Sequence, residues 1–169
     1  MIPDEILQTH ELVYPFGWFG ILANTPASKD VALFSHHDRG FALLSMRSSN
    51  VGRFYFQCPL EEDVDAWSDE QIWDELDTRL GAPGWELARG EIAQRDLTPL
   101  RSFISEPMQH GRLFLAGDAA HIVPPTGAKG LNSAVADVSV LSAALIDQIK
   151  HDDDTILCRY SEIAMRRNW

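Results

Sequence analysis

Runs of aliphatic and aromatic residues in the first half of the chain predict β-strands. Residues 40–47 and 53–58 form two such runs, and residues 48–52 between them have the composition of a turn. This pattern predicts an antiparallel hairpin, with Leu33 and Phe34 on a preceding strand. Residues 91–98 predict a further strand.

A helix is predicted to follow Ser68. Ser68 and Gln71 have the spacing of a capping box, and apolar residues recur at helical spacing from Ile72 to Leu80. Residues 81–84, rich in Gly and Pro, end the pattern. The acidic stretch 61–77 predicts a solvent-exposed surface, as charge runs generally do.

The second half predicts one buried strand and two helices. Residues 113–116 are a short apolar run, typical of a strand buried on both faces. After a loop rich in Pro and Gly, apolar residues at helical spacing predict a long amphipathic helix. A further helix is predicted from about residue 152, and its pattern still runs at Trp169, so we expect a truncated end. The apolar positions of the long helix are Leu131, Ala134, Val135, Val138, Leu141, Leu145 and Ile149.

Composition and charge narrow the class of protein. The 169 residues carry 14 Lys and Arg against 25 Asp and Glu, a net charge of −11, and form no basic stripe. Nucleic acids and anionic membrane surfaces are therefore poor partners for this chain. No apolar run approaches the roughly 18–20 residues that span a bilayer. Cys58 and Cys158 are predicted to be buried thiols in a reducing compartment, and the expected location is the cytoplasm.

The hairpin is the first place where chemistry is expected. With a turn centred near Asn50, alternation places Arg47 opposite Arg53 and Ser45 opposite Tyr55, all on one sheet face. Two facing cations favour an anion nearby, and an arginine flanked by hydroxyls suits a planar carboxylate. The alternative reading is an ordinary solvent-exposed face.

The second place is the segment 117–132. A buried strand runs into Gly117 and Asp118, and a rigid Pro-Pro loop then leads to glycines that open a helix. Backbone amides at a helix start favour a negative group, so this segment indicates an anion or cofactor site, or else an ordinary connection. No phosphate-binding or dinucleotide-binding glycine motif is present. No metal site is expected, and His121 is predicted to be a hydrogen-bonded structural histidine.

These two places closely resemble the single-component FAD-dependent aromatic hydroxylases. The stretch 106–132, which includes Gly-Asp-Ala-Ala-His-Ile-Val-Pro-Pro-Thr-Gly-Ala-Lys-Gly-Leu-Asn, resembles the second flavin-contact motif of that family. The residues 14–18, 39–43 and 99–103 and the pair Ser45 and Arg47 extend the match over nearly the whole chain. Family members look about twice as long, so this chain resembles a central fragment that lacks the ADP-binding half.

The resemblance implies an α+β fold in two parts. Residues 1–108 would be an antiparallel substrate-binding sheet domain with one helix. Residues 109–169 would be a strand and helices from an α/β FAD-binding domain. The implied reaction is hydroxylation of 4-hydroxybenzoate to 3,4-dihydroxybenzoate with FAD, O2 and NADPH as reductant. A homodimer is possible by the same analogy.

The resemblance also implies a role for each matching residue. Ser45, Arg47 and Tyr55 would hold the substrate carboxylate, and Pro125 would face the phenol end of the substrate. The remaining matches would contact the flavin or, at Arg101, NADPH. The flavin contacts would be Arg53, Asp118, Pro125, Thr126, Gly127, Lys129, Gly130, Leu131 and Asn132.

Phe34 departs from the family pattern, which has a tyrosine at this position. The phenylalanine cannot donate the hydrogen bond that helps the substrate phenol to ionise. Either His36 or His37 replaces that hydroxyl, or hydroxylation is slow and uncoupled, or the substrate is another benzoate, such as an aminobenzoate. A further alternative is that the chain is only an aromatic-acid-binding or structural module without catalysis.

Overall fold

The computed structural model describes residues 1–167 and groups the chain into two compact units. The sheet unit is residues 14–100, and the helical unit combines residues 1–13 with the chain from Arg101 onward. The sequence predicted a single division after residue 108. Both divisions separate residues 14–100 from residues 109–167, and they differ in where they place residues 1–13 and 101–108.

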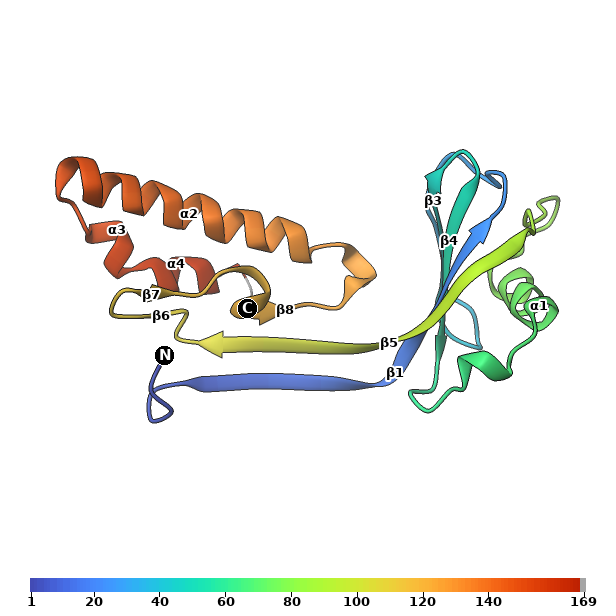
Figure 1. The fold of residues 1–169 in the computed structure, drawn as a ribbon, viewed down its shortest axis with the longest axis horizontal. Helices are drawn as coiled ribbons and strands as arrows, with labels where there is room; N and C mark the ends of the chain where they lie inside the picture. Colours follow the sequence, from blue (N-terminus) through green and yellow to red (C-terminus); the bar gives the residue numbers. More distant parts are fainter. Residues whose placement is uncertain (168–169) are drawn as a thin grey trace. The chain divides into compact units, whose positions relative to one another are not determined.

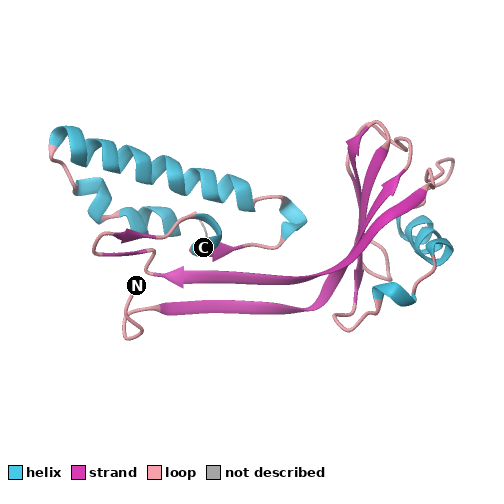
Figure 2. Ribbon diagram, viewed as in Figure 1, coloured by secondary structure: helices cyan, strands magenta, loops and turns pink. Residues whose placement is uncertain are grey.

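The predicted α+β class is confirmed, with an antiparallel sheet (Figures 1 and 2). In the sheet unit the strand order is β2-β3-β4-β1-β5, and in the helical unit the end of β5 pairs with β8. The hairpin and the strand that begins at Glu91 are confirmed. The strands are β1 (Gln8–Asn24), β2 (Leu33–Ser35), β3 (Ala42–Ser48), β4 (Val51–Cys58), β5 (Glu91–Glu106), β6 (Gln109–His110), β7 (Leu113–Phe114) and β8 (His121–Ile122).

Strand β1 was not predicted, although it is the longest strand. Its first residues are polar and exposed, and it contains Pro15, Gly17 and Gly20, which are weak strand formers. The glycines have a packing reason. A Cβ atom on Gly17 would lie 3.0 Å from the carbonyl oxygen of Thr98, so β5 approaches the β1 backbone closely here.

The core of the sheet unit lies between one face of the sheet and helix α1 (Asp69–Leu80) (Figure 1). Alternation along β4 sends Phe54 and Phe56 to this face, and Phe54 meets Trp73 edge to face with ring centroids 5.2 Å apart. The predicted capping box is present, since Ser68 Oγ accepts from the Gln71 amide at 3.2 Å. A short turn, η1 (Val64–Ala66), precedes the helix.

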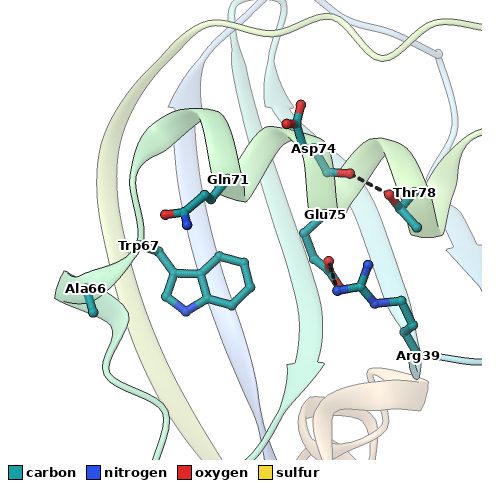
Figure 3. A pocket seen from close by; sticks show the side chains of 7 residues that line it. All are labelled: Arg39, Ala66, Trp67, Gln71, Asp74, Glu75 and Thr78. Atoms are coloured by element: carbon teal, nitrogen blue, oxygen red, sulfur yellow. Dashed lines mark hydrogen bonds and ion pairs between the residues drawn. The ribbon is translucent and has the colours of Figure 1, made fainter.

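One acidic residue of α1 is buried, against the expectation of an exposed charge run. Glu75 is 4% exposed and lies 2.6 Å from Arg39 (Figure 3) and 2.6 Å from Arg79, which is on the same helix. Arg79 also donates to the carbonyl oxygen of Gln57 on β4 at 2.8 Å. Glu75 therefore ties α1 to the loop that enters β3, and it holds Arg79 of the same helix, which bonds the sheet.

The same region contains an open cavity of about 360 Å³, shown in Figure 3. Trp67 and Gln71 line one side, and Glu75 and Arg39 meet on the other. The polar groups of Glu75 and Arg39 in this cavity bond to each other, so they already have partners.

The helical unit contains helices α2 (Gly130–His151), α3 (Thr155–Cys158) and α4 (Tyr160–Met165). Its core gathers Met108, Ala120, Tyr160 and Ala164. Both predicted helical regions are confirmed, and the second is split at Arg159. Residues 168 and 169, where we expected the helical pattern to continue, lie outside the described residues.

Two predictions about burial in the helical unit are wrong. Residues 113–116 are not a doubly buried strand, because β7 covers only Leu113 and Phe114 and pairs only with β6 in a two-stranded ribbon. Cys158 is exposed, whereas Cys58 is buried as predicted. In both cases residues of apolar type are exposed or only partly buried in the helical unit.

The apolar stripe of α2 is also largely exposed. Leu131, Val135, Val138 and Ile149 are all more than half exposed, and only Asp137 and Ala144 are buried. By length and composition this helix could cross a membrane, so the expectation that no apolar stretch reaches that length is not met. One such helix is weak evidence for a membrane span, because core helices of soluble proteins pass the same test. The stripe is therefore not covered by the helical unit itself.

Replacing Glu75 with alanine is expected to destabilise the protein by about 3–5 kcal/mol, because it leaves the buried guanidinium of Arg79 without its carboxylate. Chemical denaturation measures this change in the free energy of unfolding. The matched control is Glu70→Ala, an exposed acid on the same helix, for which a loss below about 1 kcal/mol is expected. Equal effects of the two substitutions would contradict the structural role of Glu75.

Candidate functional site

The hairpin differs from the predicted register by two residues. Ser45 pairs with Arg53, and Leu43 pairs with Tyr55. Ser45, Arg53 and Tyr55 therefore share one face, as expected, but the predicted pairs Arg47–Arg53 and Ser45–Tyr55 are wrong. Two features of one residue each make up this shift: the turn is centred between Ser49 and Asn50, since Ser48 pairs with Val51, and a β-bulge between Met46 and Ser48 adds one residue on β3.

Arg47 lies in this bulge and is exposed. The structure thus brings Ser45, Arg53 and Tyr55 together and leaves Arg47 at the end of the hairpin. A bulge interrupts strict alternation and redirects a side chain, so spacing alone could not place Arg47.

A row of aromatic rings extends from Tyr55 on this face, which is opposite to α1. Trp18 stacks on Phe41 with ring centroids 5.3 Å apart, and its ring lies 4.9 Å from that of Tyr55. Phe34 on the edge strand β2 pairs with Leu43 and lies 6.2 Å from the ring of Phe41. The rings form an apolar wall beside the polar groups, which suits a flat aromatic ligand.

Arg53 has an unsatisfied donor on this face. Its guanidinium carbon lies 5.5 Å from the centroid of the Tyr55 ring, a cation–π arrangement. Its Nε atom is buried and has no hydrogen-bond partner among the described residues. A buried N–H without an acceptor costs free energy, and an anionic ligand would supply the acceptor.

Sequence reasoning missed Asp96 and Gly20. Gly20 pairs with Tyr55 across the sheet, and a Cβ atom on Gly20 would overlap the carboxylate of Asp96 on β5. The carboxylate therefore lies directly over the β1 backbone: the Cγ atom of Asp96 is 3.4 Å from the position that a Cβ atom of residue 20 would take. The signal was a glycine within a strand, which often marks the close approach of another group.

The second group of predicted residues follows β7 in the helical unit. Gly117 opens a short turn, η2 (Gly117–Ala119), and residues 125–127 form a second turn, η3 (Pro125–Gly127). Asp118 is exposed, while Gly117 and Ala120 on either side of it are buried. The loop thus presents the Asp118 carboxylate outward between two anchored positions.

His121 is a hydrogen-bonded structural histidine, as predicted. Its Nε2 atom lies 2.6 Å from Oδ2 of Asp137 on α2, and both side chains are almost fully buried. The same carboxylate oxygen accepts a hydrogen bond from the Gly117 amide at 3.0 Å. No cluster of three or more potential metal ligands occurs within residues 1–167.

The start of α2 fits a negatively charged group. Lys129, at the N-cap, makes no side-chain capping hydrogen bond. The first amides of a helix have no partner within the helix, and they favour negative charge. Thr126, Gly127, Lys129, Leu131 and Asn132 are exposed around this end, as are Pro125 and Asp118. The exposed Asp118 carboxylate can accept hydrogen bonds from hydroxyl groups such as those of the flavin's polyol chain. The first amides of α2 can donate to a negatively charged ring such as that of a reduced flavin.

Arg101, the predicted NADPH contact, lies on β5 in the helical unit. Its NH1 group is 3.2 Å from Oε1 of Glu11 on β1, and both side chains are about half exposed. The ion pair is exposed and contributes little to stability. Arg101 is half exposed, and only its NH1 group contacts Glu11, so its other N–H donors remain accessible to a phosphate-bearing ligand.

The chain belongs to the FAD binding domain family, whose pattern it matches over residues 2–169. It is 48% identical over 169 residues to the p-hydroxybenzoate hydroxylase of Acinetobacter baylyi, covering 99% of this chain and 42% of that protein. It is also 33% identical over 112 residues to tetracenomycin A2 monooxygenase-dioxygenase from Streptomyces glaucescens, which covers 64% of this chain and 19% of that protein. The expected family is confirmed, and the chain spans less than half the length of these relatives.

Solved structures show the same fold at low identity. The p-nitrophenol 4-monooxygenase of Pseudomonas putida superposes with a TM-score of 0.74 at 22% identity, over 94% of this chain and 41% of that one. A complex of aklavinone-11 hydroxylase with FAD and aklavinone gives a TM-score of 0.65 at 21% identity, over 85% of this chain and 28% of that one. The α+β architecture is thus shared with aromatic hydroxylases.

Tyr160 in the helical core is expected to make stability pH-dependent in alkali. Burial, and secondly the charge of Asp137, raise its pKa to about 12 from a usual value of 10. Between pH 10 and 12 the unfolded chain loses this proton and the folded chain keeps it, so stability falls as pH rises through this window. Thermal melts of the wild type and Tyr160→Phe measure the effect. The variant should lack this part of the alkaline loss, although it also loses the 2.7 Å hydrogen bond to the Leu115 carbonyl oxygen at every pH.

Proposed function

We propose that this chain is the part of a flavin-dependent aromatic hydroxylase that binds an aromatic acid and the flavin, with 4-hydroxybenzoate as substrate. The observation that carries the proposal is the face shared by Ser45, Arg53 and Tyr55. On it a buried arginine donor without an acceptor lies beside hydroxyl groups and an aromatic wall. The 48% identity to a p-hydroxybenzoate hydroxylase supports the choice of substrate.

Each group has a separate task in this proposal. Ser45 and Tyr55 on the face, with Arg47 from the bulge at the end of the hairpin, hold the carboxylate, as the family resemblance implies, and Trp18 and Phe41 enclose the ring. Arg53, whose guanidinium lies over the Tyr55 ring, supplies a second positive charge and would also contact the flavin, as the family resemblance implies. Hydrogen bonds to charged groups contribute about 1.5–3 kcal/mol each, which is enough to select an acid over a plain phenol.

The helical unit supplies the flavin contacts in the proposal. Asp118 accepts hydrogen bonds from the ribityl hydroxyls, and residues 125–132 with the first amides of α2 lie next to the ring. Bound FAD would supply the reduction of O2 and the transfer of one oxygen atom to the substrate ring. The α2 amides and Lys129 would stabilise negative charge on the reduced ring.

The remaining assignments belong to the same proposal. NADPH is the reductant, with Arg101 as one of its contacts, and the protein acts in the cytoplasm. Its partners are small aromatic acids rather than nucleic acids or membranes, and it forms a homodimer. The acidic net charge of −11 supports the exclusion of nucleic acids.

Ligand titration of single variants tests the carboxylate site. Arg47→Gln and Tyr55→Phe should each weaken 4-hydroxybenzoate binding about 10-fold or more, and leave binding of unsubstituted phenol nearly unchanged, because phenol has no carboxylate. Arg53→Gln shows whether the second arginine acts on the same ligand. Arg39→Gln is the control, since Arg39 bonds to Glu75 on the α1 side of the sheet. Loss of phenol and acid binding in parallel would contradict carboxylate recognition.

Phe34 favours a second candidate function, the hydroxylation of another benzoate such as an aminobenzoate. Phe34 is 62% exposed on the edge strand and brings no hydroxyl to the face. A free phenol has a pKa of about 10, so it needs a polar partner to ionise near neutral pH, whereas an aminobenzoate needs no such step.

Phe34→Tyr distinguishes these candidates through the absorbance of bound 4-hydroxybenzoate, which reports its phenolate form. If the phenol is the substrate and lacks a partner, the added hydroxyl should raise the phenolate fraction of the bound ligand about 10-fold. It should leave the affinity for 4-aminobenzoate within about 2-fold. A tighter affinity of the wild type for 4-aminobenzoate than for 4-hydroxybenzoate, unchanged in Phe34→Tyr, would favour the aminobenzoate instead.

A further inference from the structure

Asp137 is a buried acid in the middle of a helix whose apolar residues are exposed. It is 1% exposed, whereas Leu131, Val135 and Val138 on the same helix are more than half exposed. A buried carboxylate costs free energy unless hydrogen bonds compensate it. In a simple amphipathic helix the apolar residues are buried and the acids are exposed. Here the arrangement is reversed, so the burial of Asp137 needs a specific explanation.

The compensating bonds all lead to one loop. Oδ2 of Asp137 accepts from the Gly117 amide at 3.0 Å and lies 2.6 Å from Nε2 of His121. One oxygen atom therefore holds both ends of the five-residue segment 117–121. With Asp137 as the carboxylate, the shared hydrogen lies on Nε2 of the imidazole.

Packing and backbone bonds fix the same segment further. Gly117 has φ +59°, and a Cβ atom there would lie 3.1 Å from Cβ of Ala134 on α2, so the loop backbone lies against the helix. Ala120 donates to the Gly117 carbonyl at 2.8 Å, and the Ala120 carbonyl accepts from Ser105 on β5 at 2.7 Å. Within this fixed segment Asp118 is exposed and free to meet a ligand.

We infer that Asp137 is a positioning residue for flavin binding: it pins Gly117 and His121 to α2 and so sets the direction in which Asp118 is presented. The inference rests on the proposed function, in which Asp118 contacts the flavin. Asp137 itself is buried and touches no ligand in this scheme. Its effect reaches the flavin only through the loop.

The first measurement is hydrogen exchange of backbone amides by NMR on the full 169-residue chain. In Asp137→Ala the Gly117 amide should exchange at least 10-fold faster, while amides of the β3–β4 hairpin in the sheet unit serve as an internal reference. Asp137→Asn should restore most of the protection, because its amide oxygen can still accept both bonds. Asp137→Val fills the same space without an acceptor, so it replaces Asp137→Ala if the alanine variant does not fold.

The second measurement is FAD affinity by flavin fluorescence, analysed as a double-mutant cycle with Asp118→Ala. Asp137→Ala should weaken FAD binding about 10-fold in the wild-type chain and clearly less in the Asp118→Ala chain, since the effect passes through Asp118. Tyr160→Phe is the matched control. It removes a hydrogen bond from the same core but none from segment 117–121, so FAD affinity should change less than 3-fold.

The outcomes separate this inference from the proposed function. Unchanged Gly117 exchange in Asp137→Ala, or additive losses in the cycle, would overturn the positioning role. An equal loss of affinity in Tyr160→Phe would also overturn it, because general destabilisation would then explain the effect. If the unchanged chain binds no FAD, the proposed flavin site fails, and Gly117 exchange alone then decides whether Asp137 pins the loop.

Discussion

The strict alternation of side chains along β4 is the constraint on which the sheet unit depends. Phe54 and Phe56 point into the core beneath α1, and Arg53 and Tyr55 consequently point to the opposite face. Because the period of a strand is two, a slip of one residue would exchange the core face and the face of Arg53 and Tyr55. The hydrophobic core thus fixes the register, and the register fixes which polar groups meet.

Buried acids on helices serve similar purposes in both units. Glu75 on α1 joins Arg39 and Arg79, and through Arg79 it reaches the β4 backbone. Asp137 on α2 joins the two ends of the loop that carries Asp118. In each case one carboxylate accepts two bonds: Glu75 from Arg39 in a loop and from Arg79 on its own helix, and Asp137 from both ends of segment 117–121. Such bonds give a defined position to a segment that apolar contacts would leave free to slide.

Much of the fold could be predicted from local signals, because those signals have local causes. The capping box at Ser68, the hairpin around residue 50 and the long helix from Gly130 rest on caps, turns and periodicity, and the structure confirms them. The hairpin register could not be predicted, since a bulge leaves no signature in the pattern of apolar residues. Strand β1 and the burial of Glu75 and Asp137 depend on partners far away in the sequence, which periodicity does not report.

In the candidate site, too, the locally encoded features could be predicted and the long-range ones could not. The residue types on the face were evident from alternation, and segment 117–132 was recognised because its sequence resembles a flavin-contact motif. The contributions of Trp18, Asp96 and Gly20 arise from β1 and β5, whose pairing is long-range. The sequence identified Arg47 as a candidate, but its position in the β-bulge could not be predicted.

The close fit of Asp96 over Gly20 has a consequence for how the face can evolve. Any side chain at position 20 would displace a carboxylate and press on the Tyr55 ring, which is 3.1 Å from the Cβ position. Position 20 beneath the face of Arg53 and Tyr55 therefore tolerates almost no variation. The rim at Phe34 is on an edge strand and open to solvent, so new ligand preferences would arise there at little cost to folding.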